Sequence, residues 1–183
     1  MIKSRLFCLV VLFLGLVSHP TLAQTKPRLY HKNNYWLGLG LGATHLPSAM
    51  GALGYEFTDR PTLIIARYVN NQQVFSDNVP GVKIKEAALL YGVRTGKFRF
   101  STGLSGVWGV KRGKYLSSDP DPLIYGSNYY ESIRYTTVGI PGEIRFITSN
   151  QDVGLGVTAF GNLNGRQSFA GLNVCLYIGQ MKQ

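Results

Sequence analysis

The sequence predicts an all-β protein, an eight-stranded antiparallel up-and-down transmembrane β-barrel. Three observations favour this fold. Apolar residues alternate with small or polar residues along most of the chain, which is the period of a strand with two different faces. Many of the 22 glycines fall inside these alternating segments, where the crowded interior of a narrow barrel favours them. Short polar connections alternate with longer ones, as in outer-membrane barrels.

The first four predicted strands cover residues 35–44, 49–57, 62–70 and 84–95. In the first strand, Leu37, Leu39 and Leu41 share one face and glycines occupy the other. In the fourth strand, Leu89 and Tyr91 share the apolar face. Because side chains alternate across a strand, these apolar residues are predicted to face lipid and the intervening residues to face the lumen.

The last four predicted strands cover residues 98–111, 134–147, 153–162 and 169–179. The fifth has the clearest alternation, with Phe98, Phe100 and Leu104 on its apolar face. Pro141 lies inside the sixth strand, where proline removes a donor from the hydrogen-bond ladder. We expect a β-bulge beside Gly139 and Gly142 to accommodate it.

The connections predict how the barrel is oriented. Short polar segments, 58–61, 95–97 and 148–152, follow the second, fourth and sixth strands. Longer segments, 71–82 and 112–133, follow the third and fifth. Tight periplasmic turns and longer external loops are typical of outer-membrane barrels, so both ends of the barrel are expected in the periplasm. The connections after the first and seventh strands are shorter than this rule requires.

The N-terminal segment predicts export. Lys3 and Arg5 precede an apolar stretch, residues 6–17, that is too short to span a bilayer comfortably as a helix. We therefore expect residues 1–23 to be a signal peptide, cleaved before Gln24, and residues 24–183 to be one outer-membrane barrel domain of a Gram-negative bacterium. An uncleaved anchor is the alternative. Cleavage would leave Cys175 as the single cysteine, expected to be a buried, unreactive thiol.

The charge points to an anionic surface as partner. The chain has a formal net charge of +10, but its basic residues are scattered rather than gathered in one patch. A scattered charge on an exported chain does not favour nucleic acid. Outer-membrane lipid and lipopolysaccharide are the expected partners of this excess charge.

Charged residues also fall on the predicted inner face of the strands. An eight-stranded barrel is mostly filled by side chains, and unpaired charges there would be costly, so we expect ion pairs that plug the lumen. Glu143 in particular should be surrounded by inward arginines, from its own strand or across the lumen. A narrow polar path or a ligand pocket is the alternative. The predicted interior network comprises Glu56, Arg67, Glu86, Arg94, Arg99, Lys111, Glu143 and Arg145.

Aromatic residues predict the depth of the barrel in the membrane, because aromatic rings favour both interfaces of a bilayer. One belt is expected at the periplasmic ends of the strands, and a second, with Tyr68, Trp108 and Tyr135, towards the outside ends. The predicted membrane-facing aromatic residues are Tyr55, Phe57, Tyr68, Tyr91, Phe98, Phe100, Trp108 and Phe146.

Two stretches carry a family resemblance. They read VGIPGEIR at residues 138–145 and GNLN at 161–164, the latter leading through Gly171 to Gly179. Together with the strand pattern they resemble small outer-membrane β-barrel proteins of Bacteroidetes type, in the OmpA/OmpX-like or PorT-like barrel group. The resemblance implies an outer-membrane barrel recognised by the barrel assembly machinery.

No pattern predicts catalysis, a cofactor or a metal. His31 and His45 are not at ligand spacing, and no elbow motif surrounds Ser105. We expect a monomeric barrel with a structural role, or with a role in surface interaction with an unknown partner through loops 71–82 and 112–133. An adaptable contact surface and a mobile, unselective loop are the two alternatives for residues 112–133. One alternative is a soluble exported lipocalin-like ligand-binding barrel, which would need polar residues outside. Another is a lipid-modifying enzyme with His45 and Ser48 at the rim.

Overall fold

The computed structural model describes residues 34–74, 76–119, 128–150 and 152–181. The predicted signal peptide, residues 1–23, lies outside these ranges. Within the residues described, no helix is long and apolar enough to cross a membrane.

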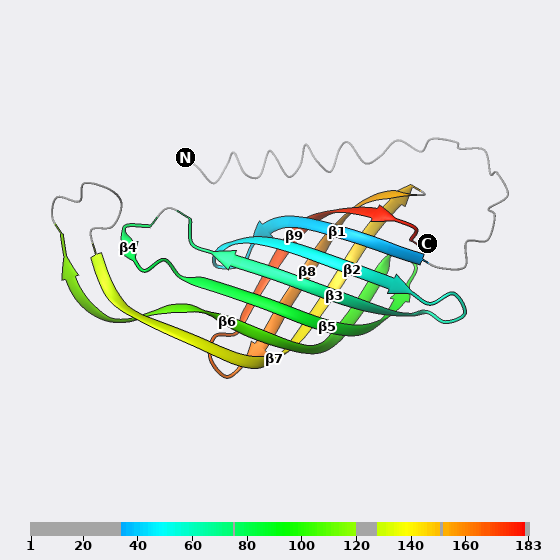
Figure 1. Ribbon diagram of the computed structural model, residues 1–183. Helices are drawn as coiled ribbons and strands as arrows, with labels where there is room; N and C mark the ends of the chain where they lie inside the picture. The colour runs from blue at the N-terminus through cyan, green and yellow to red at the C-terminus, as the bar shows by residue number, and fades with distance from the viewer. Residues whose placement is uncertain (1–33, 75, 120–127, 151, 182–183) are drawn as a thin grey trace. The chain divides into compact units, whose positions relative to one another are not determined.

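Eight antiparallel strands close into a barrel, which confirms the predicted fold (Figure 1). Each strand pairs with the next along the chain, and β1 pairs with β9 to close the barrel. The short turns 57–61, 96–97 and 151–152 lie at the end where β1 begins and β9 ends, whereas the short turns 44–46 and 165–168 and the two long connections lie at the other end. The strands of the barrel are β1 Asn34–Ala43, β2 Pro47–Glu56, β3 Thr62–Gln72, β5 Lys83–Thr95, β6 Phe98–Ser118, β7 Asn128–Asn150, β8 Val153–Asn164 and β9 Phe169–Gly179.

The two long connections contain more β-structure than the sequence predicts. β5 pairs with β6 only as far as Val110, and β8 pairs with β7 only from Gly139 onwards. Residues 111–118 of β6 and 128–133 of β7 therefore pair with each other but not with β5 or β8, as an extension that we call the β6–β7 ribbon. Figure 1 shows it extending beyond the other strands. In the 71–82 connection, the short strand β4, Asn78–Val79, pairs in parallel with residues 128–129 of β7, which belong to the ribbon.

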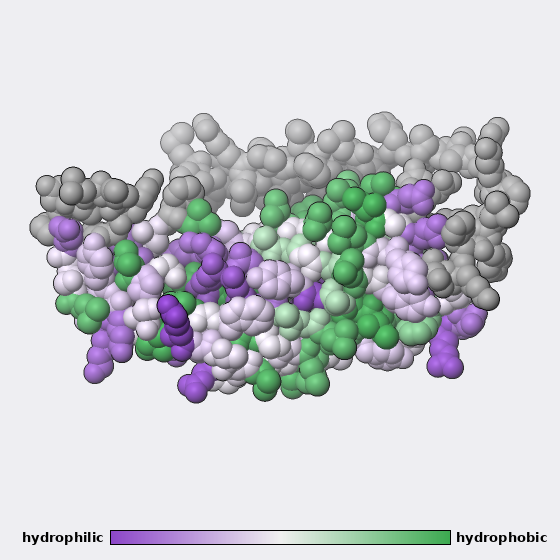
Figure 2. Space-filling view, viewed as in Figure 1, coloured by the Kyte–Doolittle hydropathy of each residue, from purple (hydrophilic) through white to green (hydrophobic). Residues whose placement is uncertain are grey.

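The two faces of the barrel wall differ as the alternation predicts. Large apolar side chains are exposed on the outer face, and Leu104 is 74% exposed. Figure 2 shows hydrophobic residues gathered over this wall, with strongly hydrophilic residues mainly towards its ends. The inner face is tightly filled. A Cβ atom at Gly54 would lie only 2.0 Å from the buried indole of Trp36, so the lumen has no room for a larger residue there.

Pro141 is accommodated without the expected bulge. The pairing of Thr102 with Gly142 and of Ser105 with Gly139 keeps one register on both sides of the proline. Between these pairs the β6–β7 ladder is interrupted, and the Thr102 hydroxyl donates to the Pro141 carbonyl at 2.8 Å. The bulge prediction is therefore wrong here, because a local opening of the ladder is enough for a residue without an N–H. The register shifts of this strand pair lie in the ribbon, after Arg112.

Candidate functional site

Four ionised side chains meet in the middle of the lumen. Arg67 of β3 donates to Glu86 Oε2 at 2.8 Å and to Glu143 Oε2 at 2.9 Å. Arg145 of β7 donates to both oxygens of Glu143, at 2.5 and 2.7 Å. All four side chains are fully buried. Glu143 thus lies between an arginine from its own strand and one from across the lumen.

Neutral side chains complete the hydrogen bonding of the two carboxylates. Ser101 donates to Glu143 Oε1 at 2.9 Å, and the Asn162 amide donates to Glu86 Oε1 at 2.6 Å. Each of the four carboxylate oxygens therefore accepts at least one hydrogen bond. Such saturation is what makes buried ion pairs tolerable in a low-dielectric interior.

Aromatic rings cover the cationic side of this central network. The Arg145 guanidinium lies 5.2 Å from the ring centroid of Trp36 and 6.0 Å from that of Tyr177. Arg67 lies 5.7 Å from the ring of Phe160. Because ring faces attract cations and exclude water, they close the lumen around the charges.

A second, smaller network lies nearer the short turns. Glu56 of β2 accepts from Arg94 at 2.9 Å and from Arg99 at 2.7 Å. Arg94 is half-buried, whereas Glu56 and Arg99 are buried. Two adjacent strands, β5 and β6, thus hold one acid of β2, which is separated from β5 by β3.

Lys111 differs from the expectation of an interior network. It is half-buried and lies opposite Ile133 at the start of the ribbon. Among the described residues, no carboxylate lies within ion-pair distance of its amine. The physical reason is that β6 has left the closed barrel at this point, so inward parity no longer directs a side chain into the lumen.

Sequence reasoning missed Arg112, which anchors the segment after β3 to the ribbon. Its guanidinium stacks over the Tyr130 ring, 5.8 Å from the centroid. It also donates to four acceptors in the connecting segment, namely the side chains of Gln73 and Ser76 and the carbonyls of Asn78 and Pro80. The only sequence signal was an arginine in a short basic stretch, residues 111–114, which does not indicate a partner 32 to 39 positions away.

The ribbon exposes apolar side chains beyond the barrel. Tyr115 and Leu116 are 56% and 65% exposed, and Tyr129 is also exposed. Tyr115 and Tyr130 pack edge to face across the ribbon, with ring centroids 5.6 Å apart. Rigid aromatic groups of this kind provide contact area at a low cost in conformational entropy.

The predicted membrane-facing aromatic residues lie on the outer face, where Tyr68, Tyr91, Phe98, Phe100, Trp108 and Phe146 are exposed and Tyr55 and Phe57 are half-buried. Phe98 and Trp108 are ten positions apart on β6. At about 3.3 Å per residue and a tilt of about 40°, this separation corresponds to a height of about 25 Å, which matches the apolar band of an outer-membrane barrel. Tyr135 differs from the expectation, because it is buried and faces inward.

The residues considered for rim chemistry do not come together. His45 is exposed in the turn between β1 and β2, whereas Ser48 is buried on the inner face of β2. Cys175 is a buried free thiol, 3.4 Å from the Thr158 hydroxyl.

The comparisons with known proteins concern the fold alone. No protein-family model matches the sequence. A search of curated proteins returns no match. Among solved structures, the chain is similar to the N-terminal β-barrel domain of Pseudomonas aeruginosa OprF, with a TM-score of 0.50 and 9% identity over 81% of this chain and 98% of that one.

Two further barrels align over similar lengths. The Yersinia pestis outer membrane protein Ail aligns with a TM-score of 0.46 and 11% identity, over 80% of this chain and 99% of that one. Neisserial surface protein A aligns with a TM-score of 0.43 and 10% identity, over 80% and 94%. The protein thus has a closed eight-stranded antiparallel barrel fold, and the OprF barrel domain is similar to it in fold.

Proposed function

We propose that this protein is a monomeric outer-membrane barrel that anchors a surface-exposed contact element, the β6–β7 ribbon, and has no enzymatic activity. We also propose that the chain belongs to the Bacteroidetes-type barrel group, is exported with cleavage after Ala23 and is inserted by the barrel assembly machinery. The observation that carries it is the inverted wall, with leucines such as Leu104 outside and buried ion pairs inside. A soluble lipocalin-like barrel needs the opposite arrangement.

Cell fractionation tests the membrane assignment. We expect the protein in the outer-membrane fraction, with an N-terminus at Gln24 and with faster gel migration before heating than after it. Recovery as a stable, soluble monomer from the periplasm would overturn the assignment and favour the lipocalin-like alternative.

The surface role rests on the ribbon and on its anchor Arg112. A two-stranded extension alone would be marginally stable in water, but β4 and the four hydrogen bonds from Arg112 support it. A supported ribbon with exposed Tyr115 and Leu116 offers a preformed surface for a partner.

Cysteine labelling tests whether the ribbon faces the outside. A Leu116→Cys variant should react with a membrane-impermeant maleimide on intact cells. The matched Arg60→Cys variant, in a short turn, should react only after the outer membrane is opened. Cys175 is buried and should contribute little background. Labelling of Arg60→Cys but not Leu116→Cys on intact cells would reverse the proposed orientation.

The filled lumen supports an anchor rather than a channel. Arg67, Glu143 and Arg145 bridge the interior between β3 and β7 and leave their charges paired. Planar-bilayer recording should therefore show no stable single-channel steps. Regular conductance steps from the purified protein would instead favour the narrow polar path.

A further inference from the structure

Three basic side chains line one hollow on the outside of the barrel wall. Lys83 and Lys85 come from β5 and Arg134 from β7, and with Trp108 of β6 they border a cavity of about 280 Å³. The strand register explains why they meet. Lys83 and Arg134 both lie level with Val110 of β6, and Lys85 lies level with Trp108.

The positive charge of this hollow is not balanced by acidic groups. Within the described part of the chain, none of the three cations forms an ion pair with a carboxylate. Both lysines are half-buried and Arg134 is exposed. Like charges that share a small space repel one another, and an anion bound between them relieves this repulsion. Lysine and arginine together favour a phosphate, which accepts several charged hydrogen bonds.

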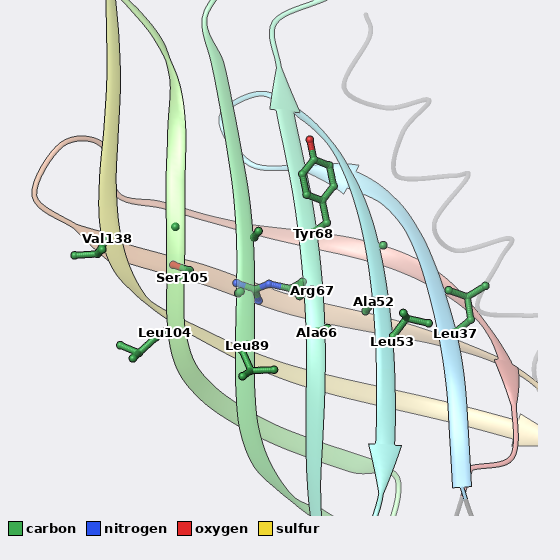
Figure 3. A pocket seen from close by; sticks show the side chains of 14 residues that line it. Leu37, Ala52, Leu53, Ala66, Arg67, Tyr68, Leu89, Leu104, Ser105 and Val138 are labelled. Carbon is green, nitrogen blue, oxygen red and sulfur yellow. The ribbon is translucent and has the colours of Figure 1, made fainter.

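A larger apolar hollow begins on the same wall, two residues along each strand from Lys85 and Trp108. It measures about 1030 Å³. Small residues form its floor, including Gly51, Ala66, Ala87 and Gly106, and leucines form its sides. Figure 3 shows Leu53, Leu89 and Leu104 directed away from the strands around it, while Arg67 runs behind β5. No atom lies within 4 Å of a Cβ added at Gly106, so this part of the floor is open.

The aromatic pair Tyr68 and Trp108 marks the boundary between the two hollows. Their ring centroids are 6.3 Å apart, and both rings are on the outer face. Tyrosine and tryptophan rings favour the depth of lipid headgroups. The basic hollow thus lies at headgroup depth and the apolar hollow lies within the hydrocarbon layer, if the barrel spans a membrane as proposed.

We infer that this wall binds one outer-leaflet lipid of the lipid A type, a phosphorylated glucosamine disaccharide that carries several acyl chains. Lys83, Lys85 and Arg134 hold a phosphate, and one acyl chain lies over Gly106 and Ala87. The positive charge of the basic hollow matches the phosphate of such a lipid, and the adjoining apolar hollow matches its acyl chains. The inference goes beyond the proposed surface role, because it uses the barrel wall and not the ribbon.

Lipid binding by the purified protein in detergent tests the phosphate contact. Native mass spectrometry with purified bisphosphorylated lipid A should show one lipid retained per monomer. The variant Lys83→Gln/Lys85→Gln/Arg134→Gln should bind it at least about 10-fold more weakly, because it loses charged contacts. A control, Arg60→Gln/Lys97→Gln/Arg166→Gln, removes the same formal charge from turns outside the hollow and should bind as the parent does.

A second pair of variants tests the acyl-chain contact. Gly106→Leu should fill part of the apolar hollow and weaken lipid A binding several-fold. Gly142→Leu is the matched control, because a Cβ there also meets no atom within 4 Å and Gly142 does not line the apolar hollow. Both variants should keep heat-modifiable migration, which shows that the barrel is folded.

Three results would overturn the inference. Equal binding of bisphosphorylated and fully dephosphorylated lipid A would exclude a phosphate site. Full displacement of lipid A by millimolar inorganic pyrophosphate, with no effect of Gly106→Leu, would indicate a site for free anions. A dimer that dissociates in the triple variant would indicate that a second copy of the chain covers this wall. None of these results would contradict the outer-membrane assignment, which the fractionation experiment tests separately.

Discussion

Glu143 is the residue on which the central network depends, because it accepts from Arg67, Arg145 and Ser101 at once. Replacing it removes one of two acids from a buried set of four charges. Arg67 then keeps Glu86, whereas Arg145 is left without a carboxylate in a space closed by aromatic rings. The breaking of a buried pair costs about 3–5 kcal/mol, since it leaves a charge without compensation.

Glu143→Gln should therefore lower the unfolding midpoint of the detergent-folded barrel markedly. Arg60→Gln, in an exposed turn, should leave the midpoint nearly unchanged, and this comparison controls for the loss of a charge. Thermal or denaturant unfolding, followed by gel migration, measures both. An unchanged midpoint for Glu143→Gln would mean that water reaches the lumen and compensates the arginines.

At the residue scale, parity alone could indicate which charges face inward, but not their partners. Arg67 and Glu143 are 76 positions apart and belong to strands that are not neighbours. Their contact depends on the relative height of β3 and β7, which follows from the stagger of all the strands between them. Arg94 and Arg99 also face inward, but they contact Glu56 and not Glu143.

The ribbon shows, at the element scale, why the end of a strand is harder to predict than its middle. In the proposed membrane setting, lipid favours apolar residues on the outer face, and this accounts for the alternation in the barrel strands. Beyond the proposed membrane layer, both faces of a strand would meet water. Residues 111–118 and 128–133 therefore carry the glycine, serine and tyrosine composition of a loop, although they pair as strands.

Arg112→Ala should release the segment after β3 from the ribbon. The acceptors on Gln73, Ser76, Asn78 and Pro80 lose their side-chain donor. The backbone amides of residues 76–79 and of the ribbon should therefore exchange hydrogen faster. The unfolding midpoint of the barrel should change little, because Arg112 lies outside the closed wall. Hydrogen-exchange mass spectrometry checks this, with Lys114→Ala, an exposed residue of the same strand, as control. Equal exchange in the two variants would mean that β4 pairing alone holds the segment.

At the scale of the whole molecule, the strand number, pairing order and closure of the barrel followed from period-two alternation and from connection lengths. These signals were strong because the two faces of every barrel strand differ: the outer face is apolar and exposed, whereas the inner face is crowded. The basic hollow with Lys83, Lys85 and Arg134 could not be predicted from the sequence. Its residues lie on β5 and β7, and only the register of both strands with β6 brings them together.

A single charge on the outer wall tests the membrane assignment for the whole barrel. Leu104 is 74% exposed on β6 and lies within the proposed hydrocarbon layer, whereas Leu116 is 65% exposed on the ribbon of the same strand. An arginine near the bilayer midplane costs about 2–4 kcal/mol, and one in water costs almost nothing. Leu104→Arg should therefore reduce the amount of folded protein in the outer membrane at low expression, and Leu116→Arg should not. The measure is the heat-modifiable fraction in isolated membranes. If the two variants assemble equally well, Leu104 does not face lipid, and the wall that carries the proposed lipid site faces water instead.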